Sequence, residues 1–140
     1  MPVRTLFHLA FPVNDLAAAR GFYGDVLGCT EGRSSDRWVD FDLFGHQIVA
    51  HLVEDSAGTR AANQVDADNV PIPHFGMIMQ MEEWQAFADK LVNKGVKFLI
   101  EPRIRFAGEV GEQATMFFVD PSGNALEFKG FTDFSSVFAN

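Results

Sequence analysis

Two short apolar stretches of the chain are built alike, each with a histidine near its centre. Residues 6–11 read Leu-Phe-His-Leu-Ala-Phe around His8, and residues 72–77 read Ile-Pro-His-Phe-Gly-Met around His74. A helix-like segment follows each histidine. A glycine then comes at a similar distance in both cases: Gly28 is 20 residues after His8, and Gly95 is 21 residues after His74. Unrelated core histidines would not share this downstream order. The sequence therefore predicts an internal duplication, with each histidine at the start of one repeat.

The size and charge of the chain limit what it can bind. Its 140 residues suit one compact domain, and a domain of this size buries about 68–70% of its unfolded surface. A net charge of −8 argues against nucleic acid or an anionic membrane as a partner, since both require clustered Lys and Arg. From the start of the chain we expect no leader sequence, and no apolar run approaches the length of a membrane span; the single cysteine cannot form an internal disulfide. We therefore expect a cytoplasmic protein.

The first repeat is expected to cover about residues 4–54. Asn14 or Asp15 can cap a helix that runs to Leu27, and Gly28 then suits a left-handed position at its end. The expected elements are a strand at 4–11, this helix, and strands at 30–34, 37–43 and 47–53.

A polar linker is expected at 55–71, before a second repeat at about 72–130 and an apolar tail at 131–140. The expected elements of the second repeat are a strand at 72–79, a helix at 82–94, strands at 96–100, 114–119 and 124–129, and a mobile loop at 101–113. The tail should pack on the core or on a neighbouring chain. Each repeat is then βαβββ. The predicted fold is α+β, with an open, curved mixed sheet around a central cavity.

Three polar side chains stand out because each lies in an apolar strand beside a very small neighbour on the same face. They are His8, His74 and Glu127, with the neighbours Ala10, Gly76 and Ala125. Small neighbours leave room for another group. Two imidazoles and a carboxylate, if they converge, can hold a divalent first-row metal with open positions. A single strand histidine is more often a hydrogen-bonded core or edge residue, but the duplication favours the metal site.

Two motifs resemble those of the vicinal oxygen chelate superfamily, which includes glyoxalase I, extradiol dioxygenases, fosfomycin-resistance transferases and bleomycin-binding proteins. The opening motif is HLAFPVNDL at residues 8–16 with FYGDVLG at 22–28, and the closing motif is VDPSGNALEF at 119–128. The resemblance covers nearly the whole chain and implies metal ligands at His8, His74 and Glu127. The chain is most similar to the small predicted extradiol-type dioxygenases of this superfamily.

The resemblance implies an Fe(II) enzyme that cleaves the ring of a catechol-like compound, with Mn, Ni or Zn as other possible metals. His51 lies on the strand that supplies an acid–base histidine in such dioxygenases and a fourth ligand in glyoxalase I, so it could serve either way or only line the pocket. Arg103 or Arg105 could meet a substrate carboxylate. The only tyrosine, Tyr23, falls on the first helix, whereas larger extradiol dioxygenases use a pocket tyrosine.

Two alternatives remain open at this point: a glyoxalase-type isomerase or lyase with nickel or zinc, and a non-enzymatic ligand-sequestering protein of the bleomycin-resistance type. The resemblance also implies a homodimer. It leaves open whether His8 shares a site with Glu127 of its own chain or of the partner.

Overall fold

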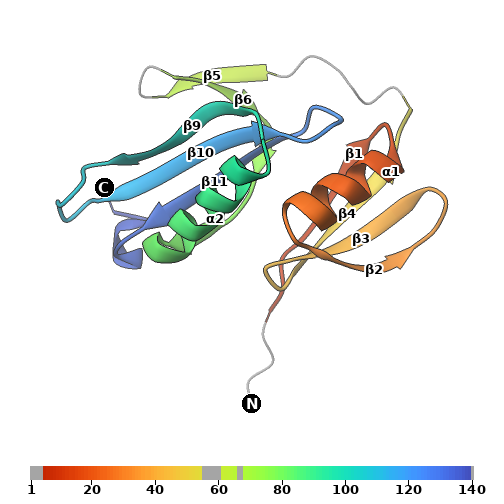
Figure 1. The fold of residues 1–140 in the computed structure, drawn as a ribbon, viewed down its shortest axis with the longest axis horizontal. Coiled ribbons are helices and arrows are strands. Elements are labelled where there is room, and N and C mark those ends of the chain that lie inside the picture. The colour runs from red at the N-terminus through yellow and green to blue at the C-terminus, as the bar shows by residue number, and fades with distance from the viewer. Residues whose placement is uncertain (1–4, 55–60, 66–67, 140) are drawn as a thin grey trace. The chain divides into compact units, whose positions relative to one another are not determined.

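The computed structural model describes residues 5–54, 61–65 and 68–139. The chain divides into an N-terminal unit, Met1–Thr59 with Asp120–Asn124, and a C-terminal unit, Arg60–Val119 with Ala125–Asn140. Each unit contains an open mixed sheet with a helix against one face, in the order βαβββ (Figure 1). The C-terminal unit also contains a separate two-stranded sheet, formed by residues 61–65 and 68–72. This confirms the predicted α+β fold of two βαβββ repeats. The central cavity between the repeats stays a prediction.

The N-terminal unit follows the predicted order closely. Its elements are β1 (His8–Val13), α1 (Leu16–Arg20), which a π-helix (Gly21–Val26) continues, β2 (Thr30–Ser34), β3 (Trp38–Leu43) and β4 (His46–Leu52). The strand order is β1-β4-β3-β2, with β1 parallel to β4 and the other pairs antiparallel. The prediction that β1 ends at Phe11 was wrong. Because β1 is at the edge of the sheet, it can include Pro12, which lacks an N–H to donate.

The helix of this unit forms where the sequence predicts it. The Asp15 carboxylate caps it by accepting the Ala18 N–H at 3.0 Å, and Gly28 has the left-handed φ of 84°. Tyr23 packs its ring against Phe11 and Phe41, with centroids 5.2 and 5.3 Å away. The helix therefore covers the face of the sheet that carries these phenylalanines.

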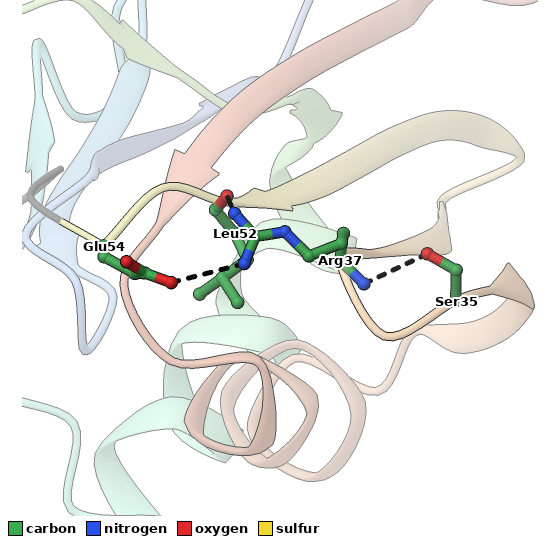
Figure 2. Close-up of polar contacts among 4 residues, drawn as sticks. All are labelled: Ser35, Arg37, Leu52 and Glu54. Atoms are coloured by element: carbon green, nitrogen blue, oxygen red, sulfur yellow. Dashed lines mark hydrogen bonds and ion pairs between the residues drawn. The ribbon is translucent and has the colours of Figure 1, made fainter.

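Arg37 connects the β2–β3 turn to the end of β4 (Figure 2). Its guanidinium donates to the Glu54 carboxylate and to the Leu52 carbonyl, both at 3.3 Å, and its backbone N–H donates to the Ser35 hydroxyl at 3.0 Å. The Leu52 N–H donates in return to the Arg37 carbonyl at 2.7 Å. The side chains of the ion pair are 55% and 76% exposed, so it contributes little to stability.

The turn between β10 and β11, residues 120–124, belongs by its contacts to the N-terminal unit. The carboxylate of Asp120 is buried and accepts the Tyr23 hydroxyl at 2.7 Å, together with the backbone N–H groups of Ser122 and Asn124. The Asn124 side chain donates to the carbonyl of Pro12 at 2.7 Å. Burial first, and then the charge and hydrogen bond of Asp120, raise the pKa of Tyr23 well above its usual value.

The C-terminal unit repeats this topology. Its elements are β5 (Ala61–Val65), β6 (Asp68–Ile72), β7 (His74–Phe75), β8 (Ile78–Gln80), α2 (Met81–Asn93), β9 (Phe98–Arg105), β10 (Gln113–Val119), β11 (Ala125–Phe131) and a 3₁₀-helix (Phe134–Ser136). The order is β7-β11-β10-β9, and β7 and β8 both pair in parallel with β11. The single strand predicted at 72–79 is thus two short strands.

The expected polar linker contains a hairpin. Strands β5 and β6 pair in antiparallel register, with Ala61 opposite Ile72 and Val65 opposite Asp68. Residues 55–60 and 66–67 of the expected linker lie outside the described residues. The linker itself stays a prediction. Its polar composition does not prevent a hairpin, because pairing of two strands satisfies the backbone groups whatever side chains they carry.

The loop predicted at 101–113 is shorter in the structure: β9 continues through Arg105 and β10 begins at Gln113, so only residues 106–112 lie between these strands. Arg103 pairs with Thr115 and Ile100 with Phe117, so two residues of β9 lie opposite one of β10 at this point. This β-bulge contains Pro102, and β9 is an edge strand, where a proline is tolerated.

Helix α2 packs its predicted stripe on the C-terminal sheet, and all four of its members are buried: Trp84, Phe87, Ala88 and Leu91. The Trp84 indole donates to the Phe128 carbonyl at 2.9 Å. A Cβ on Gly130 would lie 2.7 Å from the Trp84 Cβ, so only glycine lets helix and strand approach this closely.

The apolar tail packs only in part. Phe131 is buried at the end of β11, whereas Phe138 is 93% exposed in the single chain. Packing of this aromatic residue on a neighbouring chain, the other predicted possibility, stays a prediction. In the described part of the chain, no helix has the length and apolar character needed to cross a membrane.

Candidate metal centre

Two of the three predicted ligands meet in the C-terminal unit. His74 on β7 lies opposite Ala125 on β11, and Glu127 is two residues further along the same face. The His74 Nε2 is 3.2 Å from the Glu127 Oε1, and these side chains are 28% and 12% exposed. The structure thus brings together an imidazole and a carboxylate that are 53 residues apart in the sequence (127 − 74).

The remaining polar atoms of this pair are already engaged. The His74 Nδ1 lies 2.6 Å from the carbonyl of Pro71, which can only accept, so Nδ1 carries the proton. The Thr115 hydroxyl donates to the Glu127 Oε2 at 2.6 Å. The ring of Phe117 meets the imidazole edge-on, with centroids 4.8 Å apart, and fixes its plane.

This arrangement leaves the two unengaged atoms facing each other. In a neutral imidazole protonated at Nδ1, Nε2 is a lone-pair acceptor, and the carboxylate Oε1 is an acceptor as well. Two acceptors 3.2 Å apart need a cation between them, either a proton or a metal ion. The Pro71 carbonyl and the Thr115 hydroxyl are outer partners of the kind that orient metal ligands. The pair can therefore supply two ligands to a divalent metal, and a proton between the two atoms would satisfy it as well.

Gly76 has a different role from the one expected. From the sequence, Gly76 was expected to be a small neighbour of His74 that leaves room for a bound group. A Cβ at this position would instead collide with the backbone carbonyl of Glu127. The missing side chain is needed so that the chain after β7 can pass close to β11, which keeps His74 beside Glu127.

A cavity of about 300 Å³ opens beside the pair, entirely within the C-terminal unit. It is lined by Val70, His74, Ile100, Arg105, Gln113, Ala114, Thr115, Phe117, Glu127 and Lys129. Two cationic side chains, Arg105 and Lys129, face this cavity. Of the two arginines predicted to meet a substrate carboxylate, Arg105 lines the cavity and Arg103 does not.

His8, the third predicted ligand, lies in the N-terminal unit, on the face of the sheet opposite the helix. On β1 it pairs in register with Gln47 on β4, and its Nδ1 is 2.7 Å from the Gln47 Oε1. The Gln47 amide nitrogen donates to the Asp40 Oδ2 at 3.2 Å. Among the described residues of the C-terminal unit, no third His, Cys, Asp or Glu completes a metal-binding group with His74 and Glu127.

His51 lies on the same face as His8 but further along the sheet, opposite Pro12 and Trp38. Pro12 is four residues after His8 on β1, which corresponds to roughly 13 Å along the strand. Gln47, and not His51, is therefore the neighbour of His8 on β4. His46, at the start of β4, is half-buried, and its Nδ1 accepts the Phe7 N–H at 2.9 Å.

Four side chains of these sites were missed by the sequence analysis: Asp40, Gln47, Thr115 and Lys129. Their contacts depend on which residues lie opposite each other in neighbouring strands. Such register follows from pairing between strands distant in sequence, and alternation along one strand does not reveal it. Tyr23 is buried against Asp120 in the N-terminal unit, so its hydroxyl is already used in the core.

Three comparisons with known proteins agree with this fold. A family model described as "Glyoxalase/Bleomycin resistance protein/Dioxygenase superfamily" matches residues 5–128. The crystal structure of a glyoxalase/bleomycin resistance protein/dioxygenase from Alicyclobacillus acidocaldarius is 31% identical, with 96% of both chains covered and a TM-score of 0.77. The metallothiol transferase FosB of Lysinibacillus sphaericus (strain C3-41) is 25% identical over 128 residues, which are 91% of this chain and 83% of FosB. The fosfomycin resistance protein FosX from Listeria monocytogenes, at 18% identity, shares the fold: its TM-score is 0.70, with 97% of this chain and 100% of FosX covered.

Proposed function

Because the chain belongs to the glyoxalase/bleomycin resistance protein/dioxygenase superfamily, we propose that it is an enzyme in which His8, His74 and Glu127 hold one divalent metal ion. Its substrate would be a small molecule with two adjacent oxygens. The observation that carries this proposal is the facing pair of His74 Nε2 and Glu127 Oε1, whose other polar atoms are engaged by the Pro71 carbonyl and the Thr115 hydroxyl.

The charge of the proposed site favours an anionic ligand. Two neutral imidazoles and one carboxylate leave a divalent ion with a net charge of about +1, and the open positions can accept a chelating monoanion. Arg105 and Lys129 add positive charge at the adjacent cavity, while Ile100 and Phe117 supply apolar surface for a ring or alkyl group. Such a cavity suits a small anion with an apolar body.

The first candidate reaction is extradiol-type cleavage of a catechol-like ring by an Fe(II) enzyme. A facial set of two histidines and one carboxylate is typical of non-haem Fe(II) oxygenases, and the metal, when bound, would supply dioxygen activation. Both oxygen atoms of dioxygen enter the product of ring cleavage, so no further reductant is needed. His51 would act as the acid–base group that exchanges protons with the substrate.

The second candidate is transfer of a thiol to an anionic substrate, which the resemblance to the metallothiol transferase FosB favours. In that reaction the thiol sulfur would form a bond to a substrate carbon as a C–O bond of that carbon breaks, for example in an epoxide. The released oxygen would take up the proton of the thiol, and the metal would act as a Lewis acid on that oxygen. Arg105 and Lys129 would bind the anionic group, and no dioxygen would be consumed.

Metal binding tests the proposal, and oxygen uptake separates the candidates. The protein is purified without a tag, its metal content is measured, and the metal-free form is titrated with Fe(II), Mn(II), Ni(II) and Zn(II) by calorimetry. Binding of one ion that His8→Ala and His74→Ala both weaken is the expected result. If neither variant changes the affinity, the proposed ligand set is wrong.

The metal-loaded protein is then given a panel of catechols under an oxygen electrode and, separately, a thiol with an anionic epoxide. Oxygen uptake supports ring cleavage, and thiol consumption without oxygen uptake supports transfer. Nickel- or zinc-dependent isomerisation with neither signal would point to glyoxalase-type chemistry. Tight binding of small molecules without turnover would indicate a sequestering protein.

The homodimer expected from the resemblance can be tested in the same samples. Mixing His8→Ala with Glu127→Gln protein creates mixed dimers. If the site is shared between two chains, a mixed dimer regains one intact metal site. If each chain builds its own site, mixing restores no tight binding.

A further inference from the structure

Three side chains form a row across the open face of the N-terminal sheet. His8 on β1 contacts Gln47 on β4, and Gln47 contacts Asp40 on β3, at 2.7 and 3.2 Å. The strands that carry them are adjacent in the sheet, in the order β1-β4-β3. The row therefore depends on the backbone register, which places His8 directly opposite Gln47.

The Asp40 carboxylate, at the end of the row, determines which groups donate and which accept along it. An ionised carboxylate can only accept, so Asp40 requires the NH₂ end of the Gln47 amide to face it. The amide oxygen must then face His8. Since that oxygen can only accept, the proton of a neutral His8 has to be on Nδ1. The lone pair of His8 is consequently on Nε2, the nitrogen that faces away from Gln47.

This is the same tautomer that the Pro71 carbonyl imposes on His74. In both units an acceptor holds the Nδ1 proton and leaves Nε2 available. In the C-terminal unit the acceptor is the backbone carbonyl of residue 71, which accepts a hydrogen bond whatever side chain that residue carries. In the N-terminal unit it is a side-chain amide, whose orientation depends on a second side chain.

We propose that Gln47 and Asp40 are positioning residues that hold His8 in the tautomer able to bind a metal through Nε2. This inference rests on the proposed metal site. The role proposed for Gln47 differs from the acid–base role considered for His51 on the same strand. Gln47 cannot take up a proton, and it acts only by orienting His8. Outer partners of metal-bound histidines affect metal affinity by about 10- to 100-fold.

Four variants separate orientation from charge. Gln47→Leu removes the acceptor for His8. Asp40→Asn lets the Gln47 amide turn, because an asparagine can donate to the Gln47 oxygen as well as accept. Asp42→Asn is the matched control: Asp42 lies on the same strand and face, carries the same charge, and contacts the Gly45 N–H at 2.6 Å through an oxygen that asparagine keeps. His8→Ala identifies the His8 signals.

The first readout is the tautomer of His8 in the metal-free protein, from ¹⁵N chemical shifts of the imidazole at mildly alkaline pH, where histidines are neutral. We expect His8 in the wild type and in Asp42→Asn to carry its proton on Nδ1. Asp40→Asn and Gln47→Leu should show a mixture of both tautomers. An unchanged His8 tautomer in both variants would overturn the inference, whatever the protein does with metals.

The second readout is the dissociation constant for the metal, measured by calorimetry. Asp40→Asn and Gln47→Leu should weaken binding by about 10- to 100-fold, and Asp42→Asn should not. Equal weakening by Asp40→Asn and Asp42→Asn would mean that only the charge of the sheet matters, and would overturn the inference. Wild-type affinity in His8→Ala would instead refute the proposed ligand set. Thermal unfolding of each variant checks that it is folded.

Discussion

In the N-terminal unit His8 lies opposite Gln47, and in the C-terminal unit His74 lies opposite Ala125, at the same place in the same strand order. The N-terminal histidine meets an amide at this position. The C-terminal histidine has a methyl group there and meets the carboxylate of Glu127, two residues further on.

The same step of two residues along β4 leads from Gln47 to Val49, so the N-terminal repeat has an apolar side chain where the C-terminal repeat has its carboxylate. The duplicated backbone thus preserves the strand order and the place of the histidine. Single positions on the neighbouring strand then decide whether that histidine faces a negative charge or a neutral acceptor.

The largest effect is expected where the two repeats differ in bulk, two residues after each histidine. Gly76→Ala should lower the free energy of unfolding by about 3 kcal/mol, because the new methyl group collides with the Glu127 carbonyl. The matched change in the other repeat, Ala10→Ser on an exposed face, should stay within about 0.5 kcal/mol. Urea unfolding of both variants measures the difference. Equal effects of the two substitutions would mean that Gly76 does not lie close to the Glu127 carbonyl in the folded protein in solution.

The next largest effect concerns the carboxylate that only one repeat has. Glu127→Gln should weaken metal binding by more than about 100-fold, since it removes a charged ligand, and Thr115→Val should weaken it by about 10-fold through the lost outer hydrogen bond. Glu31→Gln, in the exposed ion pair with Arg20 of the N-terminal unit, is the control and should leave the affinity unchanged. Wild-type affinity in Glu127→Gln would show that the carboxylate is not a ligand.

A third effect distinguishes the two cores. Each contains a buried aromatic donor: Tyr23 donates to the Asp120 carboxylate, and Trp84 donates to the Phe128 carbonyl. Because the folded pKa of Tyr23 is raised above its unfolded value of about 10, stability is fully present below that pH and falls as the pH rises above it. Tyr23→Phe should cost about 1.5 kcal/mol at neutral pH and should remove the Tyr23 contribution to this alkaline loss.

Trp84→Phe provides the comparison, since an indole does not titrate in this range. The Trp84→Phe variant should therefore lose stability at alkaline pH as the wild type does. Unfolding in urea at several pH values from neutral to strongly alkaline measures both variants. If Tyr23→Phe declines as steeply as the wild type, another group is responsible for the pH dependence.

The smallest effect is expected for the exposed ion pair in Figure 2. Glu54→Gln should change the free energy of unfolding by at most about 0.5 kcal/mol, because water and salt screen the Arg37–Glu54 pair. Repeating the urea titration at high salt should remove even this difference. A larger loss that salt does not change would mean that water and salt do not screen the Arg37–Glu54 pair.

Much of the fold follows from local patterns in the sequence. Alternation around His8 predicts which side chains share a face of β1, Asp15 and Gly28 predict the ends of the first helix, and the stripe from Trp84 to Leu91 predicts the buried face of α2. Each of these depends on residues at most a few positions apart. The local geometry of a strand or helix is enough to interpret them.

The site could be predicted only in part, because its details arise between strands. The pairing of His74 with Glu127 is consistent with the predicted faces, but Gln47 becomes the neighbour of His8 only through the β1–β4 register. Gly76 looked like empty space in the sequence, and only the approach of a distant strand reveals what occupies it. Strand β9 ran past Pro102 because an edge position and a bulge, neither visible locally, accommodate that residue.

The acceptor for the Tyr23 hydroxyl comes from near the other end of the gene. Asp120–Asn124 belongs to the unit formed by Met1–Thr59, although it follows the first repeat by some sixty residues in the chain (120 − 59 = 61). A fragment that ended at residue 59 would lack this acceptor, so the Tyr23 hydroxyl of the first repeat relies on a loop of the second repeat.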